Sequence, residues 1–375
     1  MKKHLLALAA LATLSGVAAA QSATVYGIVD LSVTSQSNIS GGKRMTALTD
    51  AVWMPSVFGV TGSEDLGGGL KATFNLESDI NADTGALSNA STTANSAASA
   101  RKLFGRKANV GLTGNAGTLT VGKDIDMIFL QGFIDNIRNS HSASGFVASA
   151  IAAYNSFDTD AVFIQNMVRY TTPSYNGLKL SVQHRFGEAA GNSSLNKSDA
   201  VLANYNNGGF NLNLGYKKIT DVTPINDGLQ SSPSLTTATS QTGFDQKLTY
   251  VGANYSFDKF KVAATYHNVS NTGTGTNTLG DSKTSELGAS YAIQPNLTAA
   301  VNYVTTKFDR AALGQSKNYS ASLKYGLSKR TNVWGLVSTV KNEGAADITR
   351  AVYSIINSDA NKTTTAYSVG ITHSF

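Results

Sequence analysis

The chain repeats short segments in which apolar and polar residues alternate, and its last nine residues show this pattern most simply. Tyr367, Val369, Ile371, His373 and Phe375 share one parity, and the residues between them are Ser, Gly or Thr. A period of two predicts a β-strand with one apolar face and one small polar face. Such a strand fits the edge of a soluble sandwich. It also fits the wall of a membrane barrel, where the apolar face meets lipid and the polar face meets water.

The connections between the predicted strands distinguish these two folds. Seven short connections carry Gly, Asn, Asp, Pro or Ser and are typical of tight turns. They alternate with eight long connections, so that sixteen strands are separated. The short connections are 65–69, 114–117, 174–177, 206–209, 257–259, 294–296 and 327–330, and the long ones are 37–51, 81–100, 124–160, 188–197, 218–245, 270–282, 309–315 and 342–363. This alternation predicts an up-and-down meander with turns at one rim and loops at the other, unlike a Greek-key sandwich.

We therefore predict an all-β fold, a 16-stranded antiparallel transmembrane β-barrel. An even number of strands closes the sheet and leaves no unpaired edge in lipid. A barrel of this size leaves an aqueous channel, whereas eight strands would be filled by side chains. Tyr and Phe near the strand ends are typical of the aromatic girdle at a membrane interface.

The third long connection, 124–160, differs from the others because it is rich in apolar residues. Exposed apolar residues of this number would not remain in water. One interpretation is an external cap packed on neighbouring loops. The other is a loop folded into the barrel against its inner wall, which would narrow the pore, with a short helix within 143–153. The apolar residues are Ile125, Met127, Ile128, Phe129, Leu130, Phe133, Ile134, Ile137, Phe146, Val147 and Ile151.

The first twenty residues resemble a secretory leader. Lys2 and Lys3 form a basic start, 5–17 is a short apolar run, and three alanines at 18–20 fit a cleavage site. We therefore expect a signal peptide at 1–20 and a mature barrel at 21–375. The chain has no cysteine, so an exported protein of this sequence has neither disulfides nor thiolate metal sites. Its mild basicity does not predict nucleic-acid binding, because the cations are scattered and the leader directs export.

Six motifs resemble those of the general diffusion porins of neisserial and β-proteobacterial type. The longest is the hairpin VFGVTGSEDLGGGLKATFNLE at 57–77. The others are VYGIVD at 25–30, GRKANVGL at 105–112, NMVRYTTP at 166–173, LSKRT at 327–331 and GITHSF at 370–375. The resemblance spans the mature chain in order. It implies a trimeric outer-membrane porin with its third loop folded inward, moving small hydrophilic solutes and ions passively without a cofactor. The terminal Phe375 is the candidate assembly signal.

The sequence departs from this family at positions that usually line the pore. Val57 and Phe163 stand where the family usually has arginine, and Lys123 stands where arginine is frequent. Arg106 matches a family arginine. Alternation along 108–112 directs Lys107 inward and Arg106 outward unless a bulge intervenes, so both are candidates.

Charges near a constriction decide which solutes a wet pore favours. Lys217, Lys261 and Lys324 also read inward, but nothing in the sequence places them at a constriction. The candidate cations are Lys71, Arg106, Lys107, Lys123, Arg169, Lys179 and Arg185, and the candidate anions are Glu77, Asp79, Asp124, Asp126 and Asp135. The charge pattern is compatible with a weak anion preference.

Other functions have weaker support in the sequence. A substrate-specific channel would carry a track of lumen-facing aromatic residues, yet most aromatic residues here read outward. A barrel acting as an adhesin through its long polar loops remains an alternative. An enzyme is disfavoured, since no G-x-S-x-G elbow and no H-x-x-x-H pair occurs. We expect no cofactor, no metal and no nucleic acid; the expected partners are outer-membrane lipid, two further copies of the chain, and the solutes.

Overall fold

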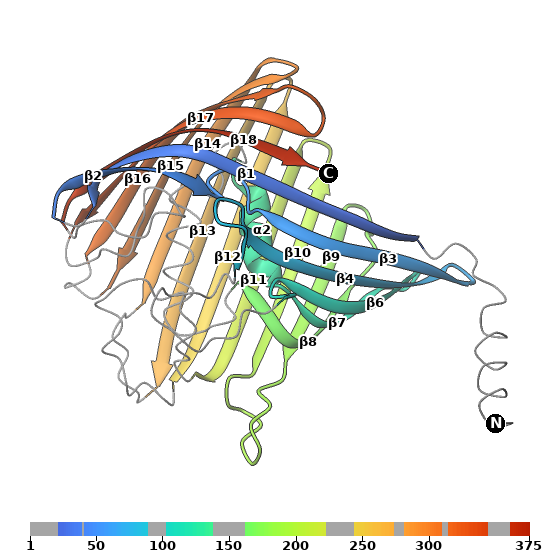
Figure 1. The fold of residues 1–375 in the computed structure, drawn as a ribbon. Coiled ribbons are helices and arrows are strands. Elements are labelled where there is room, and N and C mark those ends of the chain that lie inside the picture. Colours follow the sequence, from blue (N-terminus) through green and yellow to red (C-terminus); the bar gives the residue numbers. More distant parts are fainter. Residues whose placement is uncertain are drawn as a thin grey trace, which may run out of the picture.

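The computed structural model describes residues 22–39, 41–88, 103–137, 162–222, 244–273, 281–309, 314–343 and 361–375. These residues form one antiparallel sheet that closes on itself (Figure 1). Among them, no helix is long and apolar enough to cross a membrane. The strands are β1 (Ser22–Ile39), β2 (Lys43–Asp50), β3 (Val57–Gly67), β4 (Leu70–Asn81), β5 (Ala86–Ser88), β6 (Lys107–Gly114), β7 (Gly117–Ile125), β8 (Phe163–Thr171), β9 (Leu178–Arg185), β10 (Ser198–Asn207), β11 (Phe210–Val222), β12 (Phe244–Phe257), β13 (Phe260–Gly273), β14 (Ser282–Gln294), β15 (Leu297–Phe308), β16 (Gln315–Gly326), β17 (Thr331–Glu343) and β18 (Thr363–Ser374).

Eighteen strands fill sixteen positions in the barrel. β2 and β3 lie one after the other along β1, and β5 and β6 lie one after the other along β4. The predicted 16-stranded antiparallel barrel is therefore confirmed. Its ring closes between β1 and β18, where Ile28 pairs with Ser374 and Gln36 with Ala366. Closure continues past the last strand residue, since the Phe375 amide donates to the Gly27 carbonyl at 3.0 Å.

The strand alternation follows the predicted parity. On β18, Val369 is 71% exposed on the outer surface, whereas the inward residues Ser368 and Thr372 of the same strand are buried. All seven predicted short turns connect neighbouring strands at one rim.

The predicted long connection at 37–51 is wrong, because most of it is strand. Its Thr49 is an inward strand residue whose hydroxyl lies 2.8 Å from those of Ser32 and Thr34, so these polar residues face the lumen and do not form a loop.

One helix, α2 (Met127–Asp135), lies inside the ring of strands (Figure 1). Asp126 caps its first turn by accepting from the amides of Ile128 and Phe129 at 2.9 and 2.8 Å. Its apolar residues pack on inward side chains of the wall, including Leu202, Leu248 and Tyr250. The described start of the third long connection therefore lies within the barrel. The helix expected within 143–153 lies outside the described residues.

A second segment, 51–56 between β2 and β3, also turns into the lumen. Trp53 stacks on the inward Trp334 of β17 with ring centroids 5.2 Å apart, and both are buried. The Trp53 amide donates to the buried carboxylate of Asp30 at 2.9 Å, and Thr372 donates to the other oxygen of that group. The segment that separates β2 from β3 is thus an inward bulge held in place by these contacts.

Wall glycines make room for α2 and the residues after it. An added Cβ at Gly252 would meet Tyr250 Oη at 2.0 Å and Asp135 Oδ2 at 2.2 Å, and one at Gly288 would meet Ile137 Cγ1 at 2.6 Å. Distances of this size leave no space for a methyl group, so the end of α2 depends on bare backbone in the wall.

The first prediction concerns this close approach. Gly252→Ala forces the end of α2 away from the wall, which costs about 1–3 kcal/mol of stability and reduces the free cross-section of the lumen. We expect a lower unfolding midpoint in urea and a lower single-channel conductance. Gly335→Ala is the matched control, because nothing lies within 4 Å of its added Cβ. Equal midpoints and conductances for the two variants would contradict the packing role of Gly252.

Candidate functional site

A group of charged side chains lines the lumen where β4, β6, β7, β8 and β9 are neighbours. The strand register places these side chains on adjacent rungs, since Glu77 pairs with Lys107 and Arg169 pairs with Gln183. α2 and β11 add three further charges. We call the following eleven residues the lumen charge cluster: Glu77, Asp79, Arg106, Lys107, Lys123, Asp124, Asp126, Asp135, Arg169, Arg185 and Lys217.

Arg106 is the central cation of the lumen charge cluster. Its Nε lies 2.6 Å from Glu77 Oε1 and its Nη1 lies 2.7 Å from Asp79 Oδ1. Lys107 Nζ also approaches Glu77, at 3.3 Å. The expectation that alternation directs Arg106 outward is wrong. This residue precedes the first residue of β6, and its amide donates to the Glu77 carbonyl at 3.1 Å, so strand alternation does not govern its side chain.

Arg169 joins the wall to the start of the inward segment. Its guanidinium contacts Asp124 Oδ2 at 3.0 Å, the Ile125 carbonyl at 2.7 Å and Gln183 Oε1 at 2.6 Å. Such multiple charge-assisted contacts fix the orientation of an arginine. Arg185 is buried one rung away, where it pairs with Met167 of β8. The structure thus brings Arg169, Arg185 and Asp124 together as lumen residues.

The carboxylates of α2 have different partners. Asp126 Oδ2 lies 3.4 Å from Lys217 Nζ on β11, and both side chains are almost fully buried. Asp135 accepts hydrogen bonds from Gln131 and Asn213 at 3.0 and 2.7 Å and from the Tyr250 hydroxyl. Burial raises the pKa of Asp135, and these hydrogen bonds oppose that rise. Asp135 is therefore more easily protonated than an ordinary carboxyl group.

Phe163 and Val57, where the resemblance led us to expect arginine, lie next to Arg106 and next to its partner Asp79, respectively. The Arg106 guanidinium carbon stands 5.0 Å from the centroid of the Phe163 ring, which is cation–π geometry. Val57 is buried and pairs with Asp79 in the neighbouring strand. Both positions thus contact or adjoin the lumen charge cluster without adding a charge to it.

Two candidate cations lie elsewhere. Lys71 and Lys179 are exposed near the short turns, where they pair with Thr113 and Asn204. Sequence reasoning missed three contributors. The ion pair of Lys217 with Asp126 could not be predicted, because the two residues are distant in sequence. Tyr26 donates to Glu77 Oε2 at 2.6 Å, but the motif at 25–30 that contains it gives no indication of this contact. Trp53 lies in the inward bulge at 51–56, where the sequence shows no motif.

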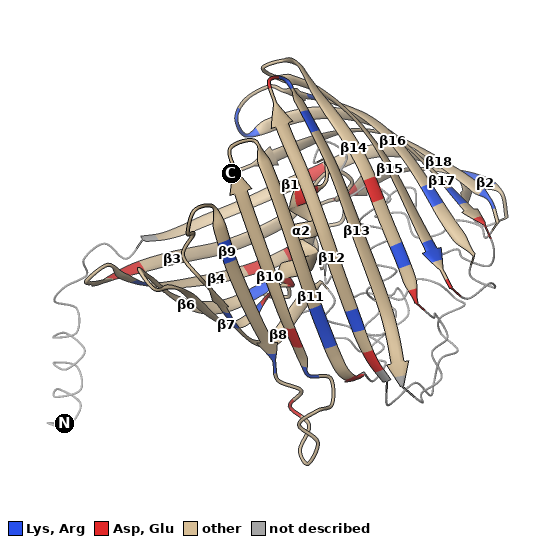
Figure 2. Cartoon of the chain, turned by 180° about the vertical axis from the view of Figure 1, so that it is seen from behind, with Lys and Arg blue, Asp and Glu red and all other residues tan. Residues whose placement is uncertain are grey.

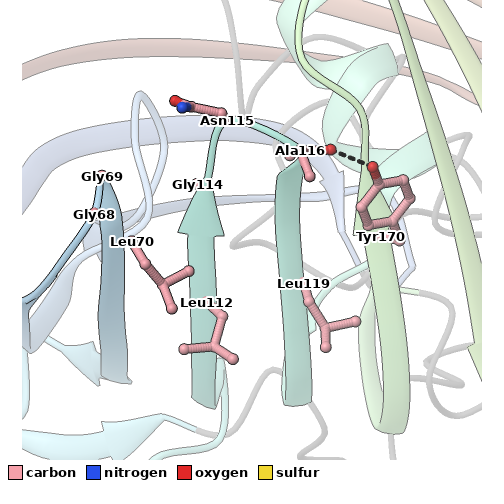
Figure 3. A pocket seen from close by; sticks show the side chains of 10 residues that line it. Gly68, Gly69, Leu70, Leu112, Gly114, Asn115, Ala116, Leu119 and Tyr170 are labelled. Carbon is pink, nitrogen blue, oxygen red and sulfur yellow. Dashed lines mark hydrogen bonds between the residues drawn. The ribbon is translucent and has the colours of Figure 1, made fainter.

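A shallow pocket of about 310 Å³ lies outside this cluster, at the short-turn rim (Figure 3). Leu70, Leu112, Leu119 and Tyr170 line it, and all four are among the exposed apolar residues of the outer surface. The Tyr170 hydroxyl donates to the Ala116 carbonyl of the adjacent turn. This pocket belongs to the apolar exterior and holds no charged side chain.

A closed barrel with an apolar exterior and a charged lumen is the geometry of an aqueous membrane channel. Residues 7–345 match the family model described as Gram-negative porin. The chain belongs to the Gram-negative porin family. Over the full length of both chains it is 28% identical to outer membrane porin protein 32 of Delftia acidovorans and 27% identical to an outer membrane porin protein of Bordetella pertussis.

Solved structures share the fold of this porin. An anion-selective porin from Comamonas acidovorans superposes with a TM-score of 0.75 at 22% identity, covering 95% of this chain and all of that one. The trimer form of OmpT from Vibrio cholerae gives 0.65 at 12% identity, covering 95% and 100%. The porin resides in the outer membrane of a Gram-negative bacterium and forms a passive diffusion channel.

The second prediction tests the central cation of the cluster. Arg106→Gln leaves Glu77 and Asp79 without their shared guanidinium. One charge within a few ångströms of the ion path changes the energy of each ion by about 1 kcal/mol in water, with opposite signs for cations and anions. The ratio of cation to anion permeability should therefore rise by up to roughly thirtyfold. Reversal potentials under a KCl gradient measure this shift.

Lys179→Gln is the matched control, because it removes one lumen cation far from the cluster. Its reversal potential should stay close to that of the unchanged porin. A difference in migration between unheated and heated samples in gel electrophoresis reports whether each variant is folded. An equal shift in both folded variants would contradict a special position for Arg106.

Proposed function

We propose that this porin carries small hydrophilic solutes and ions with a modest preference for anions. The observation that supports this is the balance of the lumen charge cluster. Six of its side chains are cationic and five are carboxylates. The cluster therefore carries a small positive excess beside the ion path. The name of the Comamonas acidovorans structure, an anion-selective porin, agrees with this proposal.

Ion pairing keeps this excess small. Arg106 pairs with both Glu77 and Asp79, and Lys107 pairs with Glu77. Asp124 pairs with Arg169, and Asp126 pairs with Lys217. A pore lined by paired charges is strongly hydrated and admits polar solutes of either sign, whereas an apolar solute gains nothing on entering it. We infer passive permeation rather than catalysis, so the chain is not expected to act as an enzyme.

We further propose that the porin is a homotrimer that matures by loss of residues 1–20. The trimer is supported by the trimer form of OmpT and by the motifs shared with trimeric porins. The leader is supported by its basic start, apolar run and terminal alanines. Phe375, which joins β1 and β18 through its backbone, is the proposed assembly signal. The intact mass of protein purified from membranes should correspond to a chain that begins at Gln21.

The third prediction tests the ion preference in planar bilayers. With a KCl gradient we expect openings in groups of three equal steps and a reversal potential of the sign set by chloride. A single excess charge changes the energies of chloride and potassium by about 1 kcal/mol in opposite directions, so it favours chloride over potassium by at most roughly thirtyfold. A reversal potential of the opposite sign would contradict the anion preference. Absence of conductance from folded, inserted protein would contradict an open channel.

A further inference from the structure

Tyr26 lies on the lumen face of β1 and reaches the lumen charge cluster from two strands away. It shares the parity of Asp30 and Ser32, which are buried inward residues of the same strand. The register pairs Tyr26 with Gly59 of β3, and it pairs Gly59 with Glu77 of β4. Tyr26, Gly59 and Glu77 therefore form one row across the wall, with Tyr26 and Glu77 at its two ends.

Gly59 makes this reach possible because it carries no side chain. Strands two positions apart in a sheet are separated by about 9.6 Å, so the phenol of Tyr26 must cross the backbone of β3 to reach β4. An added Cβ at Gly59 would meet the Tyr26 ring at 2.5 Å and its hydroxyl oxygen at 2.7 Å. The ring thus lies on the bare backbone of Gly59, where a side chain would displace it.

The hydroxyl of Tyr26 binds the carboxylate of Glu77. Its Oη donates to Glu77 Oε2 at 2.6 Å, which is typical of a hydrogen bond to a charged acceptor. The donor to the other oxygen, Oε1, is Arg106 Nε, also at 2.6 Å. Lys107 Nζ approaches Oε2 only to 3.3 Å, just beyond the usual length of a hydrogen bond. Tyr26 is therefore the close donor to Oε2.

Both oxygens of Glu77 thus have a protein donor, and the carboxylate is withdrawn from the lumen. The Glu77 side chain is 6% exposed, whereas that of its neighbour Lys107 is 26% exposed. Figure 2 shows red and blue segments close together where β4, β6 and β7 are neighbours in the wall. Because both signs of charge lie in the same place, their accessibility decides which of them a permeating ion can contact.

The contact with Tyr26 changes the accessibility of Glu77 without changing the sum of charges. A phenol is a neutral donor, unlike the guanidinium and ammonium groups that also approach this carboxylate. A carboxylate that already accepts hydrogen bonds on both oxygens has fewer acceptor sites left for a passing cation. The hydroxyl therefore affects cations in the pore directly and anions only indirectly.

We propose that Tyr26 is a positioning residue for ion selectivity, because its hydroxyl holds the Glu77 carboxylate against the wall and keeps it from binding permeating cations. This inference deepens the proposed anion preference and rests on it. It names the group that prevents a carboxylate of the lumen charge cluster from favouring cations. Tyr26 acts through Glu77 and needs no contact of its own with the ion.

The fourth prediction uses the folded porin with Tyr26→Phe, which removes the hydroxyl and keeps the ring on Gly59. Oε2 of Glu77 then becomes available to potassium. We expect the ratio of potassium to chloride permeability to rise by up to roughly fivefold, the effect of one contact between unit charges in water on the cation alone. Reversal potentials under a KCl gradient in planar bilayers measure this ratio. The single-channel conductance should stay close to that of the unchanged porin, because the ring still occupies its place.

A double-mutant cycle separates this role from a change in the shape of the pore. With Glu77→Gln in place there is no carboxylate for Tyr26 to hold, so adding Tyr26→Phe should leave the permeability ratio of that variant unchanged. A shift of equal size with and without the Glu77 carboxylate would overturn the proposal, because the hydroxyl would then act independently of that charge. An unchanged ratio for Tyr26→Phe alone would overturn it as well.

Tyr170→Phe is the matched control, because it removes a hydroxyl that donates to the Ala116 carbonyl on the outer surface. Its permeability ratio should equal that of the unchanged porin, and a shift as large as that of Tyr26→Phe would contradict a special role for Tyr26. The migration of unheated and heated samples shows whether each variant is folded. The sign of the reversal potential of the unchanged porin tests the anion preference, whereas the difference between the variants tests Tyr26, so the two proposals can fail separately.

Discussion

Pairing of every backbone amide and carbonyl inside the membrane is the constraint on which this structure depends. Lipid supplies no hydrogen-bond partner, so an open sheet edge would leave unpaired groups that cost several kcal/mol each. Closure between β1 and β18 removes that edge, and the Gly27–Phe375 contact extends it to the rim. In the closed barrel one face of every strand contacts lipid, and the polar residues on the other face of every strand line the same lumen.

That interior is too wide for wall side chains to fill, and two inward segments occupy part of it. Each is held by a buried carboxylate that accepts several hydrogen bonds. Asp30 accepts hydrogen bonds from the Trp53 amide and the Thr372 hydroxyl and so fixes the bulge at 51–56. Asp135 accepts hydrogen bonds from the Asn213 side-chain amide and the Tyr250 hydroxyl and so fixes the end of α2. Acidic residues thus position the inward segments as well as setting the charge of the pore.

Features governed by local repetition could be predicted from the sequence. Alternation identified the lumen parity of β18, and turn residues located all seven short turns, because both depend on the nearest neighbours along the chain. The failures involve partners distant in sequence. The strand within 37–51 was predicted as a loop because it is polar. Its Thr49 in fact bonds the lumen-facing hydroxyl group of Thr34 on the neighbouring strand. The backbone amide of Arg106 bonds the Glu77 carbonyl, and Lys217 pairs with Asp126. Sequence spacing predicts neither contact.

Arg106 shows why counting arginines does not decide the selectivity of this pore. Phe163 offers a ring face to the Arg106 guanidinium at 5.0 Å. The ring attracts the cation without a charge of its own, while Glu77 and Asp79 bind the same group from the wall. Phe163 therefore brings no charge to the lumen charge cluster and helps to orient the charge of Arg106. Selectivity then depends on how completely the remaining cations are paired, which is set by the geometry of the carboxylates around them.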